Sequence, residues 1–530
     1  MNASLPEMDN MDNKRPNILI VMTDQQRWDV CTPESPCRTP HMDRLIRNGL
    51  LFDRCFVPSP HCCPSRASFM TGLYPSQHGI FNNVSNRSVL GIPFPNSSLA
   101  PGVETFGEKM KAAGYRMVYT GKWHVSAVEN PEDRGWEEAG ATFCMKGLDL
   151  RNAGKIDGWF NRGHEDKAFG SPREPGEVLR PGWGVYRLYG SCPDGPGQEK
   201  TISNPQILGG YRKIDMDRKV MDHALRKLEE ISGPEADPWC LYVGLIGPHE
   251  PLIIPERYAR MYDPDAIPLP ANYMDPMGDR PQYYQKMQRR WGQLSEREVR
   301  ESIAYYYGYC TYLDDLLGEL LDRLEQKGAM DNTLVIFTSD HGEMLGNHGI
   351  YCKGPWSFDE NFAVPLVMHW PRGIQHPGRR TEALISLMDI APTLLELSGA
   401  EPFRRCAGRS LVPFLEGGGD PEEWRDCLYF QCNGTEVYIT ERVLRTERYK
   451  LMYSPFLADE LYDLKTDPLE MHNLHEDPAC AGVKQQMYQR MWEMALKAED
   501  HYLANEYATI SLAEYGPLCA AGKQSVADGG

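Results

Sequence analysis

Short apolar runs that alternate with long amphipathic stretches constrain the fold of this chain more than any other feature. The apolar runs have the composition of buried strands, and they cover residues 17–22, 239–245, 334–338 and 365–370. Residues 216–231 and 296–326 instead place their apolar side chains at helical spacing. Continuous apolar strands that alternate with helices are typical of a mostly parallel sheet with helices on both faces. The sequence therefore predicts an α/β fold.

The length and texture of the chain predict two domains. A chain of 530 residues exceeds a minimal domain, and a Gly-Gly-Gly-Asp-Pro linker begins at Gly417. We predict a large domain over residues 1–416 and a smaller α+β domain over residues 417–530. Its expected elements are strands at 427–431, 437–440 and 450–453 and a final helix at 481–497. Residues 140–203 lack periodicity, and we expect them to form a long surface insertion.

Charge and cysteine usage restrict the partners and the compartment. The net charge of −18 argues against nucleic acid and against an anionic membrane as partners. No stretch is long and apolar enough to span a bilayer, and the first 16 residues lack the apolar segment of a secretory signal. The 15 cysteines show no framework spacing, so we expect reduced thiols. These features predict a cytoplasmic protein, and they leave a homo-oligomer possible.

Polar side chains follow two of the predicted strands directly. Asp24 and Gln25 come after the first strand, and Asp340 and His341 come after the strand at 334–338. Parallel sheets bind ligands at the carboxyl ends of their strands. Three oxygen donors and one imidazole suit a divalent cation, and hard oxygen ligands favour calcium, magnesium or manganese over zinc. The alternative is that both aspartates only cap turns after strands.

A cysteine segment is the strongest chemical signal. Residues 61–72 have the sequence HCCPSRASFMTG, in which Pro64 is expected to be the first residue of a short helix. The Cys62 thiol then faces the N-terminus of a helix, where anions bind, and Arg66 adds a planar set of donors. The alternative is that Cys62 and Cys63 are buried, inert thiols.

The pattern Cys-x-Pro-Ser-Arg at Cys62, followed by Thr-Gly, resembles the signature of type I, formylglycine-dependent sulfatases of the alkaline phosphatase superfamily. Further segments resemble this family in the same order along the chain, and they are residues 15–26, 39–45, 114–124, 248–251, 339–343, 346–354 and 460–474. The resemblance implies an alkaline-phosphatase-like, mostly parallel sheet sandwiched by helices, with a smaller α+β C-terminal domain. It also implies that residues 1–416 form the catalytic domain of a sulfatase and that the insertion at 140–203 sets its specificity.

By this resemblance, Cys62 is oxidised to formylglycine by a formylglycine-generating enzyme, and the hydrated aldehyde attacks the sulfur of a sulfate monoester. The same resemblance implies that one divalent cation, calcium first and manganese or magnesium as alternatives, is held by Asp24, Gln25, Asp340, His341 and the residue at position 62. The family more often has a second aspartate where this chain has Gln25.

The resemblance also assigns an anion clamp and two proton carriers. The clamp comprises Lys122, His124 and Lys353, and Arg66 holds the hydrate. His124 takes the proton that restores the aldehyde, and His249 binds the ester and protonates the leaving alkoxide. Asn83 is expected to reach the anion as a neutral donor. For His249 the alternative is a solvated surface histidine in a Pro-His-x-Pro turn.

Two other functions remain open. A phosphonate monoester hydrolase or phosphodiesterase shares the fold, the aldehyde and an Asp-Gln metal loop, but the Lys122 and His124 clamp favours a sulfatase. A catalytically inactive, metal-stabilised binding protein would keep Cys62 as a thiol. The expected substrate is a small-molecule or saccharide sulfate ester, and the acidic surface favours a small or singly charged one.

Overall fold

The computed structural model describes residues 15–83, 98–142, 172–180, 184–194, 213–233, 237–434, 439–500 and 512–517. Most of the predicted insertion at 140–203 lies outside the described residues, so its role in specificity stays a prediction. None of the helices in the described ranges combines the length and the apolar composition needed to cross a bilayer.

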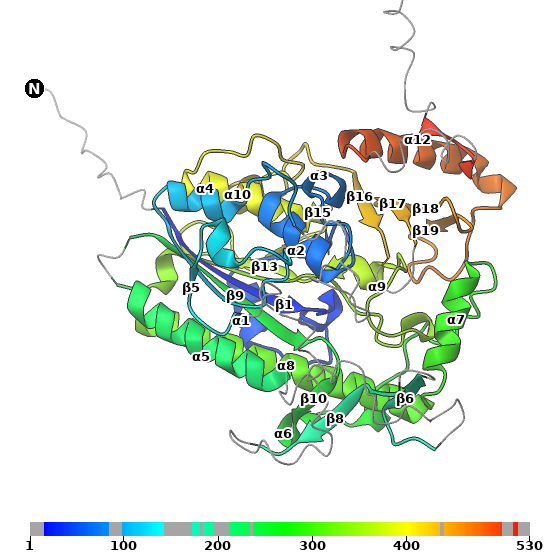
Figure 1. Cartoon of the computed structure of the whole chain (residues 1–530), viewed down its shortest axis with the longest axis horizontal. Coiled ribbons are helices and arrows are strands. Elements are labelled where there is room, and N and C mark those ends of the chain that lie inside the picture. Colours follow the sequence, from blue (N-terminus) through cyan, green and yellow to red (C-terminus); the bar gives the residue numbers. More distant parts are fainter. Residues whose placement is uncertain are drawn as a thin grey trace, which may run out of the picture.

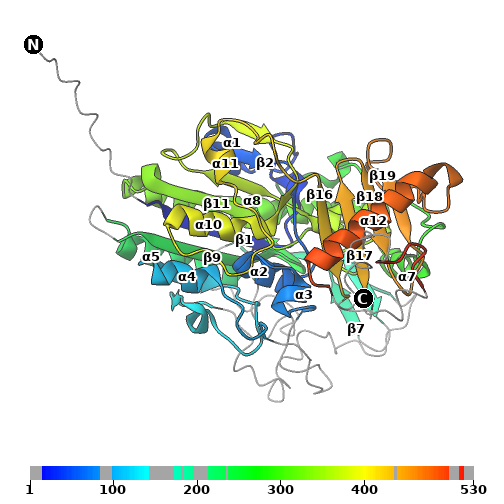
Figure 2. The same cartoon turned by 90° about the horizontal axis from the view of Figure 1, so that it is seen from above.

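The centre of the described chain is an eight-stranded sheet (Figures 1 and 2). Its strands lie in the order β14 (Arg379–Thr381), β2 (Leu50–Phe52), β13 (Leu366–His369), β11 (Thr333–Ser339), β1 (Asn17–Asp24), β9 (Trp239–Pro248), β4 (Arg116–Gly121) and β5 (Glu137–Glu138). Strand β13 is antiparallel to both of its neighbours, and the other pairs are parallel. The predicted mostly parallel sheet is therefore confirmed.

Helices cover both faces of this sheet (Figure 1). One face carries α1 (Pro40–Arg47), α5 (Lys213–Ile231) and α8 (Glu296–Gln326), and the other carries α2 (Cys62–Thr71), α4 (Phe106–Ala112) and α10 (Ile390–Ser398). The β1 side chains alternate between the two layers: Leu19 and Val21 pack toward α8, whereas Ile18 and Ile20 pack toward α2. A strand buried on both faces has to be apolar throughout, which explains the continuous apolar run.

Helix α8 shows how local sequence sets an element boundary. Ser295 accepts a hydrogen bond from the backbone N–H of Glu298, and the Glu298 carboxylate accepts one from the backbone N–H of Ser295. This capping box satisfies two N–H groups that have no acceptor within the helix. The predicted helix at 296–326 is confirmed with its boundaries.

Smaller elements surround the sheet. The short strands are β3 (Cys55–Phe56), β12 (Ala363–Val364), β15 (Ile385–Ser386), β6 (Glu177–Arg180), β7 (Gly184–Arg187), β8 (Tyr189–Cys192) and β10 (Leu252–Pro255). The short helices are α3 (Pro75–His78), α6 (Glu256–Ala259), α7 (Gln282–Trp291), α9 (Asp359–Phe362) and α11 (Val412–Glu416).

The C-terminal region forms a four-stranded antiparallel sheet within the described residues (Figure 2). Its strands are β16 (Cys427–Cys432), β17 (Glu441–Thr446), β18 (Tyr449–Tyr453) and β19 (Glu460–Asp463), and α12 (Ala481–Lys497) packs on one face through Met491 and Trp492. Phe430 and Tyr462 on the other face join the core of the large sheet. The smaller α+β C-terminal unit is confirmed, whereas the boundary at residue 417 stays a prediction.

One C-terminal strand was predicted in the wrong place. The prediction puts a strand at 437–440, but Ile439 and Thr440 are not in a strand and β17 begins at Glu441. Strand β17 pairs with β16 so that Glu441 lies opposite Cys432, and the first two residues of the predicted strand, 437 and 438, lie outside the described residues. Pairing with β16 therefore decides this boundary, and β-propensity does not.

Candidate active site

The carboxyl ends of β1 and β11 bring the predicted acidic residues together. The two strands are parallel neighbours, so Asp24 at the end of β1 lies beside Asp340, which follows β11. The backbone N–H of Gln25 donates to Asp340 Oδ1 at 3.1 Å, and the N–H of Asp340 donates to the carbonyl of Thr23 at 3.2 Å. These bonds tie the two strand ends into one rigid platform.

Helix α2 presents Cys62 to this platform. The helix begins at Cys62, with His61 as its N-cap residue, and it ends at Gly72 in the left-handed conformation (φ 67°). The expectation that Pro64 is the first helical residue is wrong, because Pro64 is the third. The first N–H groups of a helix have no acceptor inside it, so proline costs nothing at that position.

The Cys62 thiol is in contact with the residues at the strand ends. Its Sγ lies 3.2 Å from His341 Nε2 and 3.8 Å from Asp24 Oδ1. Ligand atoms of Asp24, Cys62, Asp340 and His341 all lie within 4.8 Å of one another, and all four residues are buried. His341 Nδ1 is 2.9 Å from the carbonyl of Gly342, so Nδ1 carries the hydrogen and Nε2 has its lone pair toward the cluster.

The side chain of Gln25 lies next to this cluster. Its Oε1 accepts a hydrogen bond from Lys353 Nζ at 3.1 Å, and its Nε2 donates to the carboxylates of Glu250 and Glu343. The backbone of Gln25 is left-handed (φ 68°), and its carbonyl accepts from the Tyr306 hydroxyl at 2.6 Å. The structure thus places Gln25 beside the other predicted ligands, and its role as a ligand stays a prediction.

Two buried cations neutralise the two aspartates. Lys122 Nζ forms an ion pair with Asp24, and Arg66 Nε donates to Asp340 Oδ2 at 2.7 Å. Arg66 Nη1 also donates to the carbonyl of Lys122 at 3.0 Å and to the Tyr242 hydroxyl at 3.2 Å. Among the described residues Arg66 Nη2 has no hydrogen-bond partner.

The surrounding cations favour an anion at position 62. Burial and the neighbouring Asp24 raise the pKa of the Cys62 thiol, but the combined effect of Lys122, Lys353 and His341 brings that pKa well below its usual value. Burial also raises the pKa of Asp24, but the combined effect of Lys122, His249, His341 and Lys353 brings that pKa well below its usual value. The site thus stabilises negative charge at position 62 and at the neighbouring carboxylate.

The predicted proton carriers lie on two further loops. His249 Nε2 is 2.7 Å from Lys353 Nζ, so these two residues are in direct contact. His124 has a left-handed backbone (φ 48°), and a hydrogen bond with Cys62 opposes the effects of burial and Lys122, which together lower the pKa of its imidazole. The structure therefore brings His124, His249 and Lys353 to the cysteine platform.

Asn83 contacts the start of α2. Its Oδ1 accepts a hydrogen bond from the backbone N–H of Cys63 at 3.1 Å. This bond satisfies one of the N–H groups at the helix N-terminus and holds Asn83 close to the cysteine segment. Its role as a donor to the anion remains a prediction.

Unpaired polar atoms gather around position 62. Within the described part of the chain, the buried atoms without a hydrogen-bond partner include Arg66 Nη2, Ser65 Oγ, His124 Nδ1 and both ring nitrogens of His61. Buried polar groups are normally paired, so this concentration indicates a site built for a polar ligand.

Some residues of the site carried no predicted role. Glu250 and Glu343 stand inside segments that resemble the family, and their position in those motifs was the available signal. Tyr242 lies in the middle of β9 and reads as an ordinary core residue, so no sequence signal pointed to its contact with Arg66.

Comparison with known families identifies the class of protein. The sulfatase family model matches residues 16–400, and the model of the N-sulphoglucosamine sulphohydrolase C-terminal region matches residues 346–497. The first match covers well over half of the chain, so the chain belongs to the sulfatase family, a family of sulfuric ester hydrolases.

Individual relatives align along almost the whole chain. It is 27% identical over 532 residues to the multifunctional alkaline phosphatase superfamily protein PehA of Trinickia caryophylli, which covers 93% of this chain and 97% of that protein. It is 26% identical over 531 residues to an N-acetylglucosamine-6-O-sulfatase of Bacteroides thetaiotaomicron, with 94% and 89% covered. The crystal structure of a phosphonate monoester hydrolase of Agrobacterium radiobacter matches with a TM-score of 0.69 and 26% identity, covering 91% of this chain and 96% of that one.

Proposed function

We propose that this chain hydrolyses a sulfate monoester to an alcohol and inorganic sulfate, using formylglycine formed from Cys62 and one divalent cation. The observation that carries the proposal is the position of Cys62. Its side chain lies at the N-terminus of α2 and within 4.8 Å of the ligand atoms of Asp24, Asp340 and His341. An inert core thiol has no need for two carboxylates and an imidazole around it.

The donor set fits a hard divalent cation. Asp24, Asp340 and His341 supply two carboxylates and one imidazole, and the side chain at position 62 completes the cluster. The Gln25 carbonyl oxygen is a further oxygen donor beside it. Oxygen-rich sites prefer calcium, magnesium or manganese, and we propose calcium. The cation supplies charge that polarises a sulfate oxygen and favours the deprotonated nucleophile.

The surroundings of position 62 also fit an oxygen nucleophile. A formylglycine-generating enzyme would replace the CH₂SH group of Cys62 by an aldehyde, whose hydrate supplies a hydroxyl group as nucleophile. Arg66 Nη2 has a free donor direction among the described residues, and Lys122 and Lys353 favour negative charge at this position. The partnerless donor and the charge preference support an oxyanion there.

The remaining residues bind the ester and move protons. Lys122 and Lys353 hold the non-bridging sulfate oxygens by charge. His249 in its imidazolium form, with a proton on both ring nitrogens, donates the Nε2 proton to the leaving alkoxide, since Nε2 is the ring nitrogen that faces Lys353. His124 accepts a proton at position 62, consistent with its hydrogen bond to Cys62.

A phosphonate monoester hydrolase is the second candidate, supported by the likeness to the Agrobacterium enzyme and by the Asp24-Gln25 loop. The two functions separate by kcat/KM on 4-nitrophenyl sulfate and on 4-nitrophenyl phenylphosphonate, measured on one preparation. Faster cleavage of the sulfate supports our proposal, and faster cleavage of the phosphonate contradicts it. Cys62→Ala is the control, and it should abolish both reactions.

For the substrate we propose a small or saccharide sulfate ester. The N-acetylglucosamine-6-O-sulfatase relative supports a sugar ester. The net charge of −18 disfavours a long polyanion, because such a substrate would be repelled outside the local cationic site. A screen of monosulfated sugars, steroid sulfates and aryl sulfates tests this class.

A further inference from the structure

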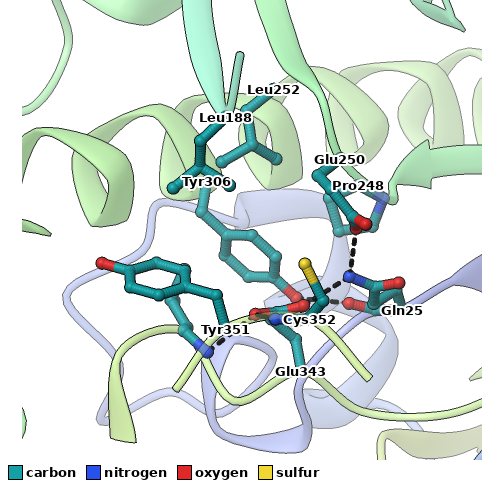
Figure 3. Close-up of a pocket in the computed structure, with 10 residues that line it drawn as sticks. Gln25, Leu188, Pro248, Glu250, Leu252, Tyr306, Glu343, Tyr351 and Cys352 are labelled. Atoms are coloured by element: carbon teal, nitrogen blue, oxygen red, sulfur yellow. Dashed lines mark hydrogen bonds between the residues drawn. The ribbon is translucent and has the colours of Figure 1, made fainter. Parts of the chain in front are cut away.

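We propose that Glu250 and Glu343 are positioning residues that hold the Gln25 amide with its carbonyl oxygen toward the cation site, and that Glu250 also orients His249. Figure 3 shows the two carboxylates on either side of the Gln25 amide nitrogen, in a pocket lined by Leu188, Leu252 and Tyr306. The part that concerns His249 rests on the proposed function. The part that concerns Gln25 needs only cation binding.

The contacts of Gln25 fix which end of its amide faces which way. Nε2 donates to Glu250 Oε2 at 2.5 Å and to Glu343 Oε2, so both of its hydrogens are used. Turning the amide over would place its oxygen against two carboxylates, which offer no donor when they are ionised. Oε1 therefore stays on the side of Lys353, whose Nζ lies 3.1 Å away.

Glu343 is itself held firmly by backbone. Its Oε1 accepts from the N–H of Leu345 at 2.8 Å and from the N–H of Cys352 at 2.7 Å. The residue is 4% exposed, so its Oε2 accepts the hydrogen bond from Gln25 in a fixed and buried position. Hydrogen bonds in such low-dielectric surroundings are stronger than in water.

Glu250 connects Gln25 with the proposed general acid. His249 Nδ1 lies 2.9 Å from the carbonyl oxygen of Glu250 and 3.1 Å from its Oε2. Both oxygens only accept, so Nδ1 carries the hydrogen and Nε2 is directed toward Lys353. Glu250 thus contacts both Gln25 and His249, whereas Glu343 contacts Gln25 but not His249.

Partners that orient metal ligands typically contribute about 10–100-fold to metal affinity. Calorimetric titration of the chelator-treated protein with CaCl₂ should therefore show about tenfold or weaker binding for Glu250→Ala and for Glu343→Ala. Glu250→Gln keeps an acceptor oxygen, so its affinity should stay within about threefold of the unmodified protein. Glu256→Ala on α6 is the control, because it removes one negative charge as the test variants do and breaks an exposed ion pair with Arg260 instead of a contact with Gln25.

A double-mutant cycle gives the sharper test. If Glu250 acts through Gln25, the change Glu250→Ala has no further effect on calcium affinity in a Gln25→Ala background. An undiminished loss in that background overturns the proposal. Equal losses in Glu250→Gln and Glu250→Ala also overturn it, because they would show an effect of charge alone. Glu343→Gln repeats the cycle if Glu343→Ala unfolds.

The role of Glu250 toward His249 is tested by comparing kcat/KM on two sulfate esters whose leaving groups differ in basicity. Phenyl sulfate needs a proton on its leaving group more than 4-nitrophenyl sulfate does. Glu250→Ala should therefore lose more kcat/KM on phenyl sulfate than on 4-nitrophenyl sulfate, whereas Glu343→Ala should lose equally on both. Equal losses in Glu250→Ala overturn its role toward His249. If the protein without substitutions fails to hydrolyse either ester although Cys62 has been converted to formylglycine, the proposed function is contradicted. The double-mutant cycle on calcium affinity would still decide the part that concerns Gln25.

Discussion

Arg66 is the residue whose removal tests the electrostatic design of the site most completely. Its side chain is 1% exposed, its Nε pairs with Asp340 at 2.7 Å, and Asp340 is fully buried. The change Arg66→Ala leaves this carboxylate in the interior without its counter-charge. The hydrogen bond to the carbonyl of Lys122 is also lost, but that carbonyl keeps the Tyr119 hydroxyl as a donor at 2.6 Å.

These contacts set the size of the effect. Breaking a buried ion pair by removing one partner costs about 3–5 kcal/mol, and the other lost hydrogen bonds add no orphaned acceptor at Lys122. We therefore expect Arg66→Ala to lower the free energy of unfolding by about 3–5 kcal/mol in the presence of EDTA. Calcium supplies part of the missing positive charge at Asp340, so the loss should shrink by about 1–3 kcal/mol when calcium is added.

Urea unfolding followed by tryptophan fluorescence, in EDTA and in CaCl₂, measures both values. Tyr242→Phe is the matched control, because it removes only the hydroxyl that accepts from Arg66, and its expected loss is about 1 kcal/mol. A loss below about 1 kcal/mol for Arg66→Ala in EDTA, or equal losses with and without calcium, would refute the reasoning.

Three further results are expected. Lys122→Ala should lower kcat/KM on an aryl sulfate by about 100-fold or more, while calorimetric calcium affinity stays equal or rises because Asp24 loses a competing cation; weaker calcium binding would contradict this. Burial raises the pKa of Glu441 to about 8, so this group costs stability as pH rises from about 4 to 8, and Glu441→Gln should flatten the pH dependence of the urea midpoint over that range. Saturating calcium, at about 100 times its Kd, should stabilise the chelator-treated protein by about 2.7 kcal/mol in the same assay, and an unchanged midpoint would argue against a cation site.

The sequence predicts the fold well where periodicity is long. Helices α8 and α12 have the predicted boundaries, since each has a continuous amphipathic pattern and α8 has a capping box. The strand at 437–440 was misplaced because short apolar runs do not reveal their pairing partner. Pro64 was misplaced by two residues, because proline is tolerated throughout the first helical turn.

The candidate site was likewise predicted only in part from the sequence. Asp24, Asp340 and His341 could be brought together from the sequence, because parallel strands end at one edge of the sheet, whereas Cys62 was added to them through the family resemblance. Other contacts depend on side-chain directions between segments that are remote in sequence. Examples are the ion pair of Arg66 with Asp340 and the hydrogen bonds from the Gln25 amide to Glu250 and Glu343. No local pattern encodes such contacts.

The central claim is that the working nucleophile derives from Cys62. Mass spectrometry of the peptide that spans Cys62 measures the fraction in which the thiol has been replaced by the aldehyde, and the same preparations give kcat on an aryl sulfate. The account predicts that kcat rises in proportion to the converted fraction and falls to zero at zero conversion. Sulfatase activity that persists in fully unconverted protein, or in Cys62→Ala, would contradict it.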